Sequence, residues 1–528
     1  MTRLMVRGRC EVCPTGVSRV IVRSLPTMAK QYRIGAGAGY SGDRIDPAVA
    51  LAESGRIDAL VFECLAERTI ALAQLRRSRD PAQGYDPLLE ARMRAVLPAC
   101  ARHGVTIVTN MGAANPPAAG AAVVRVAHEL GLPARVAVVT GDDVLPWVLA
   151  NNPPLMEAGP QGQTRACELG ELVSANAYLG ADALLPALQA LDAAGRHPTA
   201  TAPAQQVSHD SHGPSGAPGA RGEPGAGGNP VPGRTAPDVD PCARVVITGR
   251  VSDPALFLAP LMHHCGWRAD DWPLLGRGLM VGHLLECAAQ VSGGYIADPG
   301  HFDVPCLHDV GFPIAEVDAQ GRAVITKLAG TGGRVDRLTC TAQLLYELGD
   351  PACYLQPDVT GDFSQVRFTE LGIDRVQADG AGGSARPEML KATVGYRDGW
   401  IGEGQISYAG PGARARGELA LQVLAQRLDR LGLGDLERRA ELVGVNAMHG
   451  PRLGSDREPY EVRLRLAVRC GSADAAQRIG QEVEALYLNG PAGGGGVAQS
   501  VREVIAAASV LVPRSAVSTS VELLRTDL

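Results

Sequence analysis

Short apolar segments alternate with helical segments over the first half of the chain, and this alternation limits the fold more than any other feature. The apolar segments lack the alternating polar positions of a strand with one exposed face, so both of their faces should be buried. The predicted strands are residues 32–36, 59–62, 105–108, 136–139 and 244–247. The helices predicted between them are residues 46–54, 87–102, 118–130 and 186–194. This order predicts an α/β fold with a doubly wound, mostly parallel sheet covered by helices on both faces.

The second half of the chain predicts a mixed β region and then a smaller α+β domain. Residues 354–409 have β character, with strands expected at 365–368 and 392–396. The helices predicted beyond this region are residues 415–431, 473–488 and 497–508, and the strands are 460–470 and 515–524. We therefore expect an α/β domain over residues 32–435 and a C-terminal α+β domain over residues 436–528.

Two segments have compositions that are typical of disordered chain. Residues 1–31 hold six basic residues and a single acidic one, with no apolar run long enough for a signal peptide. Residues 197–240 are rich in Pro, Gly, Ala and Ser and include six consecutive Gly-X-Y triplets, too few for a stable collagen helix. We expect a disordered extension over 1–31 and a disordered insertion over 197–240 within the α/β domain.

Charge and composition exclude several classes of protein. The net charge of −6 argues against a nucleic-acid-binding protein, which usually has a basic face. No apolar run is long enough to span a membrane. The 12 cysteines are scattered, as in proteins of a reducing compartment, so a cytoplasmic location is expected. Only Lys30, Lys327 and Lys391 are lysines among 50 basic residues, so each is a candidate for a position that requires an amine.

The loops that follow the predicted parallel strands should carry the functional site, because they meet at the carboxyl edge of the sheet. Glu63 and Asn110 lie where their strands end, before a following helix could use them as N-caps. A carboxylate and an amide that face one crevice can orient a polar substrate or hold a hard cation through oxygen, so both are candidate catalytic residues. The candidate substrate-binding residues in these loops are Gly37, Gly39, Ser41, Gly42, Asp43, Arg68, Asn115, Asp142, Arg250 and Asp253.

The glycine-rich loops give only weak indications of a cofactor. The loop at 35–42 departs from the GxGxxG spacing, and no aspartate ends the second strand, which argues against NAD. Its backbone amides could still approach a phosphate or carboxylate. The loop at 489–496 lacks the lysine of a P-loop, so ATP hydrolysis is not supported. The cofactor therefore stays unknown at this stage.

A second set of candidates follows the insertion. His283 and Glu286 are three residues apart on a predicted helix face, a spacing suited to acid–base chemistry, although a buried, hydrogen-bonded histidine is the alternative. Their spacing fits no established zinc pattern, so no metal is assigned. Gly332 and Gly333 form a turn that could approach an anion. Lys327 precedes this turn and is the lysine that we single out as catalytic.

Several long motifs, in order along the chain, resemble the acyclic terpene utilisation protein A (AtuA) family. They include GAGAGYSGDRIDPA, VFECLAERTIALAQ, TNMGAANP, LLGRGLMVGHLLECAAQVSGGYIADPG, ITKLAGTGG, VGYRDGWIGEGQISYAGPGA and YLNGPAGGGG. The resemblance implies a cytoplasmic catabolic role in a pathway with acyl-CoA intermediates, and it supplies no defined reaction. Longer members of the family look as if they carry a further small ferredoxin-like domain. We therefore expect a separately encoded small subunit as a partner, and homo-oligomer formation stays open.

Two functional hypotheses follow. In the first, the protein is a lyase, hydratase or isomerase that acts on a branched carboxylate or acyl-CoA, with Glu63 or Glu286 as general base. Asn110 and the amides of 37–42 would hold substrate oxygens, and Arg68, Arg250 or Lys327 would bind the carboxylate. In the second, it is a non-catalytic ligand-binding or scaffold subunit of a degradation complex. The proposed active centre requires Glu63, Asn110 and Arg250 to lie in one basin.

Overall fold

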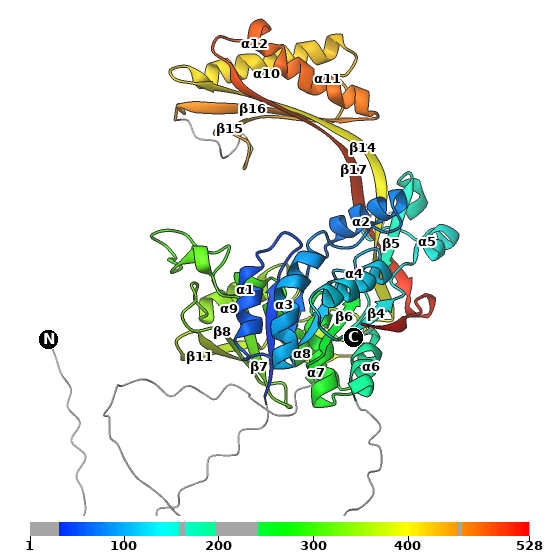
Figure 1. Ribbon diagram of the computed structural model, residues 1–528. Helices are drawn as coiled ribbons and strands as arrows, with labels where there is room; N and C mark the ends of the chain where they lie inside the picture. Colours follow the sequence, from blue (N-terminus) through cyan, green and yellow to red (C-terminus); the bar gives the residue numbers. More distant parts are fainter. Residues whose placement is uncertain (1–30, 158–163, 196–240, 451–452, 454–456, 527–528) are drawn as a thin grey trace, which may run out of the picture.

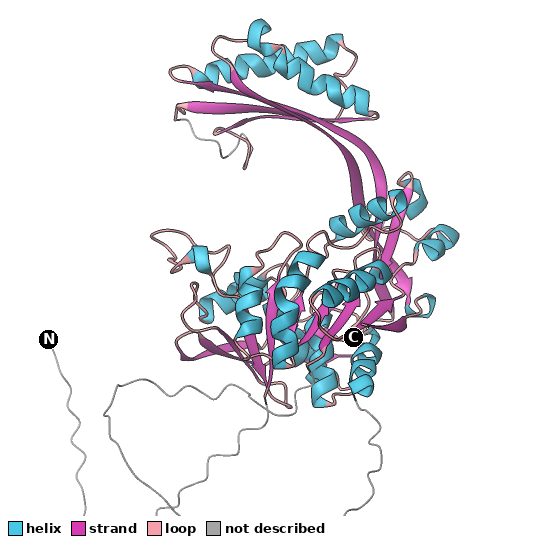
Figure 2. Cartoon of the chain, in the orientation of Figure 1, coloured by secondary structure: helices cyan, strands magenta, loops and turns pink. Residues whose placement is uncertain are grey.

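A ten-stranded mixed sheet forms the centre of the larger part of the molecule. The structure is a computed structural model that describes residues 31–157, 164–195, 241–450, 453 and 457–526 (Figures 1 and 2). The predictions for 1–30 and 197–240 therefore lie outside the described residues. The strand order of the sheet is β11-β12-β8-β7-β1-β2-β3-β6-β4-β18.

The five central strands are parallel and almost fully buried, as their apolar sequences predict. They are β1 (Tyr32–Ala38), β2 (Ala59–Phe62), β3 (Thr106–Thr109), β6 (Ala243–Thr248) and β4 (Ala134–Thr140). Three adjacent helices cover one face, namely α1 (Asp46–Glu53), α3 (Leu89–His103) and α4 (Pro116–Glu129). The helices α6 (Leu185–Gly195) and α7 (Ala255–Cys265) cover the other. The predicted α/β class with a doubly wound parallel centre is confirmed. The sheet as a whole is mixed and not mostly parallel, because five of its nine strand pairings are antiparallel.

Antiparallel strands extend the sheet at both edges. Beyond β1 lie β7 (Pro313–Val317), β8 (Ala323–Lys327), β12 (Arg375–Asp379) and β11 (Arg367–Gly372). Beyond β4 lies β18 (Ser520–Arg525). The helix α8 (Trp272–Leu285) packs on α7 and carries a small sheet of β9 (Tyr354–Leu355), β10 (Thr360–Asp362) and β13 (Gly382–Ser384). The remaining helices of this part are α2 (Glu67–Arg79), α5 (Leu145–Asn151) and α9 (Arg337–Leu345).

A long antiparallel ribbon connects this part to a separate two-layer α+β unit (Figure 1). The ribbon consists of β14 (Met389–Ala409) and β17 (Gly495–Pro513). Near the large sheet, β14 also pairs with β5 (Leu172–Ala177). At the far end it pairs with β16 (Glu461–Cys470), which pairs with β15 (Arg438–Val443). The helices on one face of this unit are α10 (Ala413–Arg430), α11 (Ala473–Glu484) and α12 (Leu486–Asn489).

The prediction of a helix at residues 497–508 is wrong, because these residues belong to β17. The segment contains three consecutive alanines, which favour a helix locally. Pairing along most of β14, from Met389 with Pro513 to Ser407 with Gly495, overrides this preference. The final strand also begins at Ser520 instead of 515, after a single 3-10 turn. Among the described residues, no helix is both long and apolar enough to cross a lipid bilayer.

Candidate functional site

Residues from the ends of three neighbouring strands meet at the carboxyl edge of the sheet. Glu63 follows β2, Asn110 follows β3 and Arg250 follows β6. The Asn110 side-chain amide donates to Glu63 Oε1 at 2.9 Å, and its Oδ1 accepts from the Cys64 backbone at 2.7 Å. The Arg250 guanidinium donates to the Leu65 carbonyl, two residues beyond Glu63. The structure therefore brings these residues together in one buried cluster, as expected for the ends of neighbouring parallel strands.

Arg250 is the centre of this cluster. Its side chain is 1 % exposed, and Nη1 lies 3.0 Å from the Asp253 carboxylate. Its guanidinium carbon lies 4.0 Å from the centroid of the Tyr178 ring, in a cation–π contact. Its backbone N–H donates to Asp142 Oδ2 at 2.9 Å. The first two contacts hold the guanidinium, and the third holds the Arg250 backbone. The guanidinium Nε has no hydrogen-bond partner among the described residues.

Three carboxyls share the field of this one guanidinium. Burial raises the pKa of Glu63, Asp253 and Glu286, and Arg250 opposes the shift in each case. The negative charges also raise one another's pKa values. Burial among like charges therefore favours retention of a proton by the cluster, and the charges of Arg250 and of His283, which pairs with Glu286, oppose it. A group of carboxyls that holds a shared proton is suited to general acid–base chemistry.

His283 orients one of these carboxyls. Its Nε2 donates to the Leu344 carbonyl at 3.0 Å, and its Nδ1 lies 2.8 Å from Glu286 Oε1. Burial lowers the pKa of His283, but Glu286 and the Leu344 carbonyl raise it overall. Both ring nitrogens are already bonded within the protein, so His283 has a positioning role in this geometry. Glu286 Oε2 is buried and has no hydrogen-bond partner among the described residues.

A second charged pair, Glu67 and Lys391, lies beside Arg250, and the sequence alone does not place this pair in the site. Glu67, the first residue of α2, accepts hydrogen bonds from the Tyr178 hydroxyl and from Lys391 Nζ, the latter at 3.3 Å. Lys391 Nζ also lies 4.9 Å from the Tyr178 ring centroid. Burial raises the pKa of Glu67, but Arg250, Tyr178 and Lys391 lower it to about 2 overall. Glu67 is therefore ionised and anchors the Lys391 ammonium.

A cavity of about 420 Å³ opens beside this cluster. Its polar wall contains Tyr178, Asp253, Tyr354 and Lys391. Its apolar wall includes Met156, Leu355, Pro357, Met389 and Leu511. The Asp253 side chain is 34 % exposed, so water reaches it although protein surrounds it. A ligand with an apolar body and a polar or anionic end matches this division of the walls.

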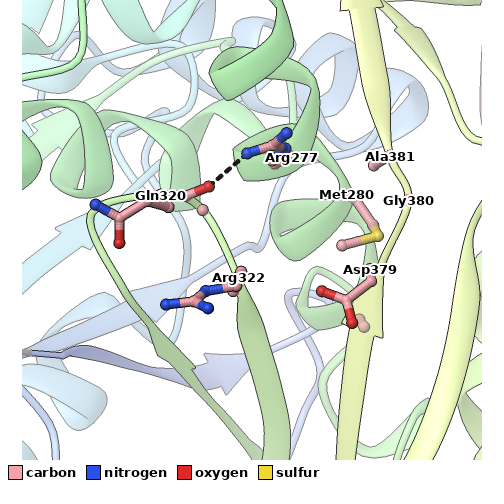
Figure 3. Close-up of a pocket in the computed structure, with 9 residues that line it drawn as sticks. Arg277, Met280, Gln320, Arg322, Asp379, Gly380 and Ala381 are labelled. Carbon is pink, nitrogen blue, oxygen red and sulfur yellow. Dashed lines mark hydrogen bonds between the residues drawn. The ribbon is translucent and has the colours of Figure 1, made fainter. Parts of the chain in front are cut away.

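A larger cavity, of about 630 Å³, lies at the opposite ends of the parallel strands, their amino ends (Figure 3). It lies between α8, the turn after β7 and the end of β12, and Arg277 donates there to the Gln320 carbonyl at 2.8 Å. Val317, just before that turn, pairs with Tyr32 at the start of β1, which identifies the amino edge of the parallel strands. This cavity contains none of the predicted site residues. The smaller cavity at the carboxyl edge is therefore the candidate site.

The glycine-rich loop after β1 does not form the open anion cradle that its sequence suggests. The Gly39 amide donates to the Asp43 carboxylate at 2.9 Å, so a side chain of the loop itself takes the place of an anion. A β-carbon at Gly37 would lie 2.7 Å from the Phe62 ring, and one at Gly42 would lie 2.8 Å from the Tyr40 ring. Gly37 and Gly42 thus permit close packing, and the Gly39 amide and the Asp43 carboxylate are already bonded to each other.

A buried ion pair, also missed from the sequence, holds this loop. Ser41 donates to the Asp86 carboxylate at 2.5 Å. Arg92 is fully buried, lies 3.6 Å from the same carboxylate and donates to the Ser41 and Asp43 carbonyls at 2.9 and 3.1 Å. Ser41 is thus part of a structural network. The loop and α3 are tied together by charge-assisted hydrogen bonds, which explains a buried arginine on a helix that faces the sheet.

Gly39 lets the end of β1 approach the end of α8. A β-carbon at Gly39 would lie 2.6 Å from the Cys287 backbone. We expect Gly39→Ala to lower the free energy of unfolding by about 1–3 kcal/mol, as overpacking does. Gly349→Ala is the matched control, because a β-carbon there meets no atom within 4 Å, and its effect should stay within about 0.5 kcal/mol. Urea unfolding measures both, and equal midpoints for the two variants would contradict the packing argument.

Asn115 and Arg68 lie away from the cluster. The Asn115 side chain accepts from Ala118 N at the start of α4 and donates to the Pro81 and Gln83 carbonyls, so it caps the helix and fixes a loop. Arg68 is exposed on α2 and has no hydrogen bond or ion pair within the described part of the chain. Neither has the contacts expected of a substrate-binding residue in this structure.

Lys327 and the turn at Gly332 and Gly333, for which the sequence predicts anion binding, form a separate structural cluster. Lys327 lies 3.0 Å from Asp374 and donates to the Thr331 carbonyl at 2.8 Å. The Gly332 and Gly333 amides donate to backbone carbonyls at 2.8 and 2.7 Å, so neither is free for a ligand. The lysine at the cavity is Lys391 and not Lys327. The scarcity of lysine was a signal for both, but only tertiary structure distinguishes them.

Asp142 holds the backbone of Arg250 in place. It accepts from the Arg250 backbone N–H and from the Asn176 side chain at 2.9 and 2.8 Å. Burial raises the pKa of Asp142 from 3.8 to about 6. The folded state therefore keeps this proton to higher pH than the unfolded chain does. The stability that the raised pKa of Asp142 gives to the folded state is complete below about pH 4 and is lost as the pH rises through about 6.

This linkage gives a prediction for Asp142→Asn. Between pH 4 and pH 7, the free energy of unfolding of the wild type should fall by about 3 kcal/mol relative to the variant, because the shift is about two pKa units. Denaturant unfolding at several pH values measures the difference. The offset caused by the altered hydrogen bonds cancels in this comparison, and parallel curves would show that Asp142 titrates normally.

The described residues contain no group of three or more His, Cys, Asp or Glu side chains arranged to hold a metal ion. The protein matches no curated protein and no solved structure with significant similarity. A family model described as "Acyclic terpene utilisation family protein AtuA" matches residues 32–193 and 239–523. That match covers most of the chain, on both sides of the insertion. The chain therefore belongs to the acyclic terpene utilisation AtuA family.

Proposed function

We propose that the protein is a catabolic acid–base enzyme that acts on a branched carboxylate or acyl-CoA by lyase, hydratase or isomerase chemistry. The observation that carries the proposal is Asp253, a carboxyl of the proton-sharing cluster that also lines an amphipathic cavity. Membership of a family named for the use of acyclic terpenes is consistent with branched, apolar substrates. The reducing-compartment cysteine usage supports a cytoplasmic location.

The cavity walls support binding of such a ligand. Met156, Met389 and Leu511 provide an apolar surface for a branched chain. Arg250 is buried and already paired, so Lys391, which is 40 % exposed, is the cation we assign to the ligand's carboxylate or to an acyl-CoA phosphate. Its hydrogen bond to Glu67 uses only one of its N–H groups and fixes its position.

The chemistry common to the three reaction classes is proton transfer beside a carbonyl group. In its ionised state, Asp253 takes a proton from the carbon next to the carbonyl, and the C–H electron pair moves to give an enolate. The proton can return to a different carbon, which isomerises a double bond, or a leaving group can depart, which forms one. Hydration is the reverse of water elimination. Glu63 and Glu286 share the charge of the cluster and can exchange protons with it.

The alternative function is a non-catalytic ligand-binding or scaffold subunit. The two-layer unit at the end of the ribbon favours it, because Tyr487 and Leu488 on α12 are 51 % and 94 % exposed. Exposed apolar side chains on an extended unit are typical of contact surfaces. A separately encoded small ferredoxin-like subunit and a second copy of the chain are both proposed partners. Purification of the native protein without any companion would count against the small subunit.

The experiment that tests the proposed function is steady-state turnover of branched enoic acids and their CoA thioesters. We expect turnover by the wild type and slower turnover by Glu63→Gln and Glu286→Gln, because these changes alter the shared proton of the cluster. An inactive wild type that still binds these ligands would favour the scaffold function. Wild-type rates in both variants would remove these two glutamates from the chemistry.

A further inference from the structure

Tyr354 on β9 has a rigidly held ring at the wall of the cavity. Its ring centroid lies 5.2 Å from that of His283 and 5.6 Å from that of Phe363, and both pairs are tilted. His283 and Phe363 also contact each other, with centroids 6.0 Å apart. Each contact is an ordinary aromatic pair, and together they fix the ring plane. The position of the phenol oxygen is therefore set before any ligand binds.

The hydroxyl of Tyr354 has no hydrogen-bond partner in the described part of the chain, although its ring is well packed. Among the described residues, no hydrogen bond reaches this oxygen, and the side chain lines the cavity that contains Asp253. A tyrosine hydroxyl in a half-buried position usually finds a partner. Tyr178, on the same cavity, does so by donating to Glu67. An unpaired donor in a preformed cavity is the arrangement expected of a ligand contact.

The surroundings keep this hydroxyl protonated. Burial raises the pKa of Tyr354, and the carboxyls of Glu286, Asp253 and Glu347 raise it further. The phenol therefore acts as a neutral hydrogen-bond donor and not as an acid. The same carboxyls show that the ring lies within electrostatic reach of the proton-sharing cluster. Tyr354 and Asp253 line the same cavity, so a donor here can reach a carbonyl compound whose proton Asp253 takes.

We propose that Tyr354 is a catalytic residue whose hydroxyl donates a hydrogen bond to the carbonyl oxygen of the ligand while Asp253 exchanges a proton with the adjacent carbon. The inference rests on the proposed function and adds to it the group that stabilises the enolate oxygen. No proton leaves Tyr354, so the step needs no further reactant. Donors of this kind act mainly on the transition state, and removing one typically lowers kcat by about 100- to 1000-fold.

Tyr354→Phe tests the proposal, because phenylalanine keeps the ring contacts with His283 and Phe363. We expect kcat on branched enoyl thioesters to fall about 100-fold, with a much smaller change in KM and an unchanged Tm. Tyr460→Phe is the matched control, since Tyr460 lies on the distant α+β unit and is 79 % exposed. It should keep wild-type kinetics. A kcat within twofold of the wild type for Tyr354→Phe would overturn the proposal.

A spectroscopic measurement separates this inference from the proposed function. A ¹³C=O-labelled branched acyl thioester bound to the wild type should show a carbonyl stretch at lower frequency than in solution, and Tyr354→Phe should abolish that shift. This result would support the hydrogen bond even if the wild type has no turnover and the proposed function fails. An equal shift in both proteins, or no binding at all, would overturn the role of Tyr354.

Discussion

Asp253→Asn should lower kcat by about 100- to 10,000-fold while leaving the affinity for a branched carboxylate within a few-fold of the wild type. The amide has nearly the shape of the carboxyl and keeps the cavity wall, but it can neither take up nor release a proton. Asp253 is the one member of the carboxyl cluster that also lines the cavity. Turnover assays and calorimetric binding give the two quantities separately.

The control for this variant is Asp379→Asn, which makes the same change in the larger cavity at the amino edge. It should keep wild-type turnover. The loss of the contact between Asp253 and Arg250, 3.0 Å in the wild type, makes a check of folding necessary, and near-UV circular dichroism supplies it. A folded Asp253→Asn variant with a wild-type kcat would show that the cluster transfers no proton to the ligand.

Arg250→Met should lower the free energy of unfolding by about 3–5 kcal/mol, because it removes a buried guanidinium that balances the charge of buried carboxyls. The side chain is 1 % exposed and contacts Asp253, the Leu65 carbonyl and the Tyr178 ring. Methionine restores part of the volume but none of the charge. Denaturant unfolding monitored by tryptophan fluorescence measures the change, and the variant should recover stability at low pH as the carboxyls become protonated.

Arg68→Met is the matched control, because Arg68 is exposed and has no hydrogen bond or ion pair within the described residues. Its effect should stay within about 0.5 kcal/mol. Comparable losses for the two arginines would mean that the buried cluster contributes little to folding. A loss for Arg250→Met that does not depend on pH would mean that the lost contacts, and not the unbalanced carboxyls, determine its size.

The parallel centre of the fold could be predicted because its signals are local. Each of β1, β2, β3, β4 and β6 is a mostly apolar run that differs from the prediction by at most two residues at either end. The convergence of Glu63, Asn110 and Arg250 follows from the same reading, since parallel strands deliver their ends to one edge. The predicted helix at 497–508 is a strand because pairing of β17 with β14 overrides the helical preference of its alanines.

The rest of the site depends on contacts that no local pattern encodes. Lys391 reaches Glu67 and Tyr178 because β14 pairs with β5, with Ala392 opposite Ala177. That pairing brings together segments on either side of the insertion. The glycine loop shows the opposite case, because its sequence suits an anion but Asp43 already occupies the Gly39 amide. Sequence can indicate where donors lie, but only tertiary structure shows whether they are free.

The most direct test of the account is a crystal structure of the protein with a bound branched enoic acid. The account predicts the ligand in the cavity at the carboxyl edge, with its carboxylate at Lys391, its apolar chain against Met389 and Leu511, and the carbon next to its carbonyl facing Asp253. A ligand bound instead between Arg277 and Arg322 in the larger cavity, or a ligand that avoids Asp253, would contradict the central claim.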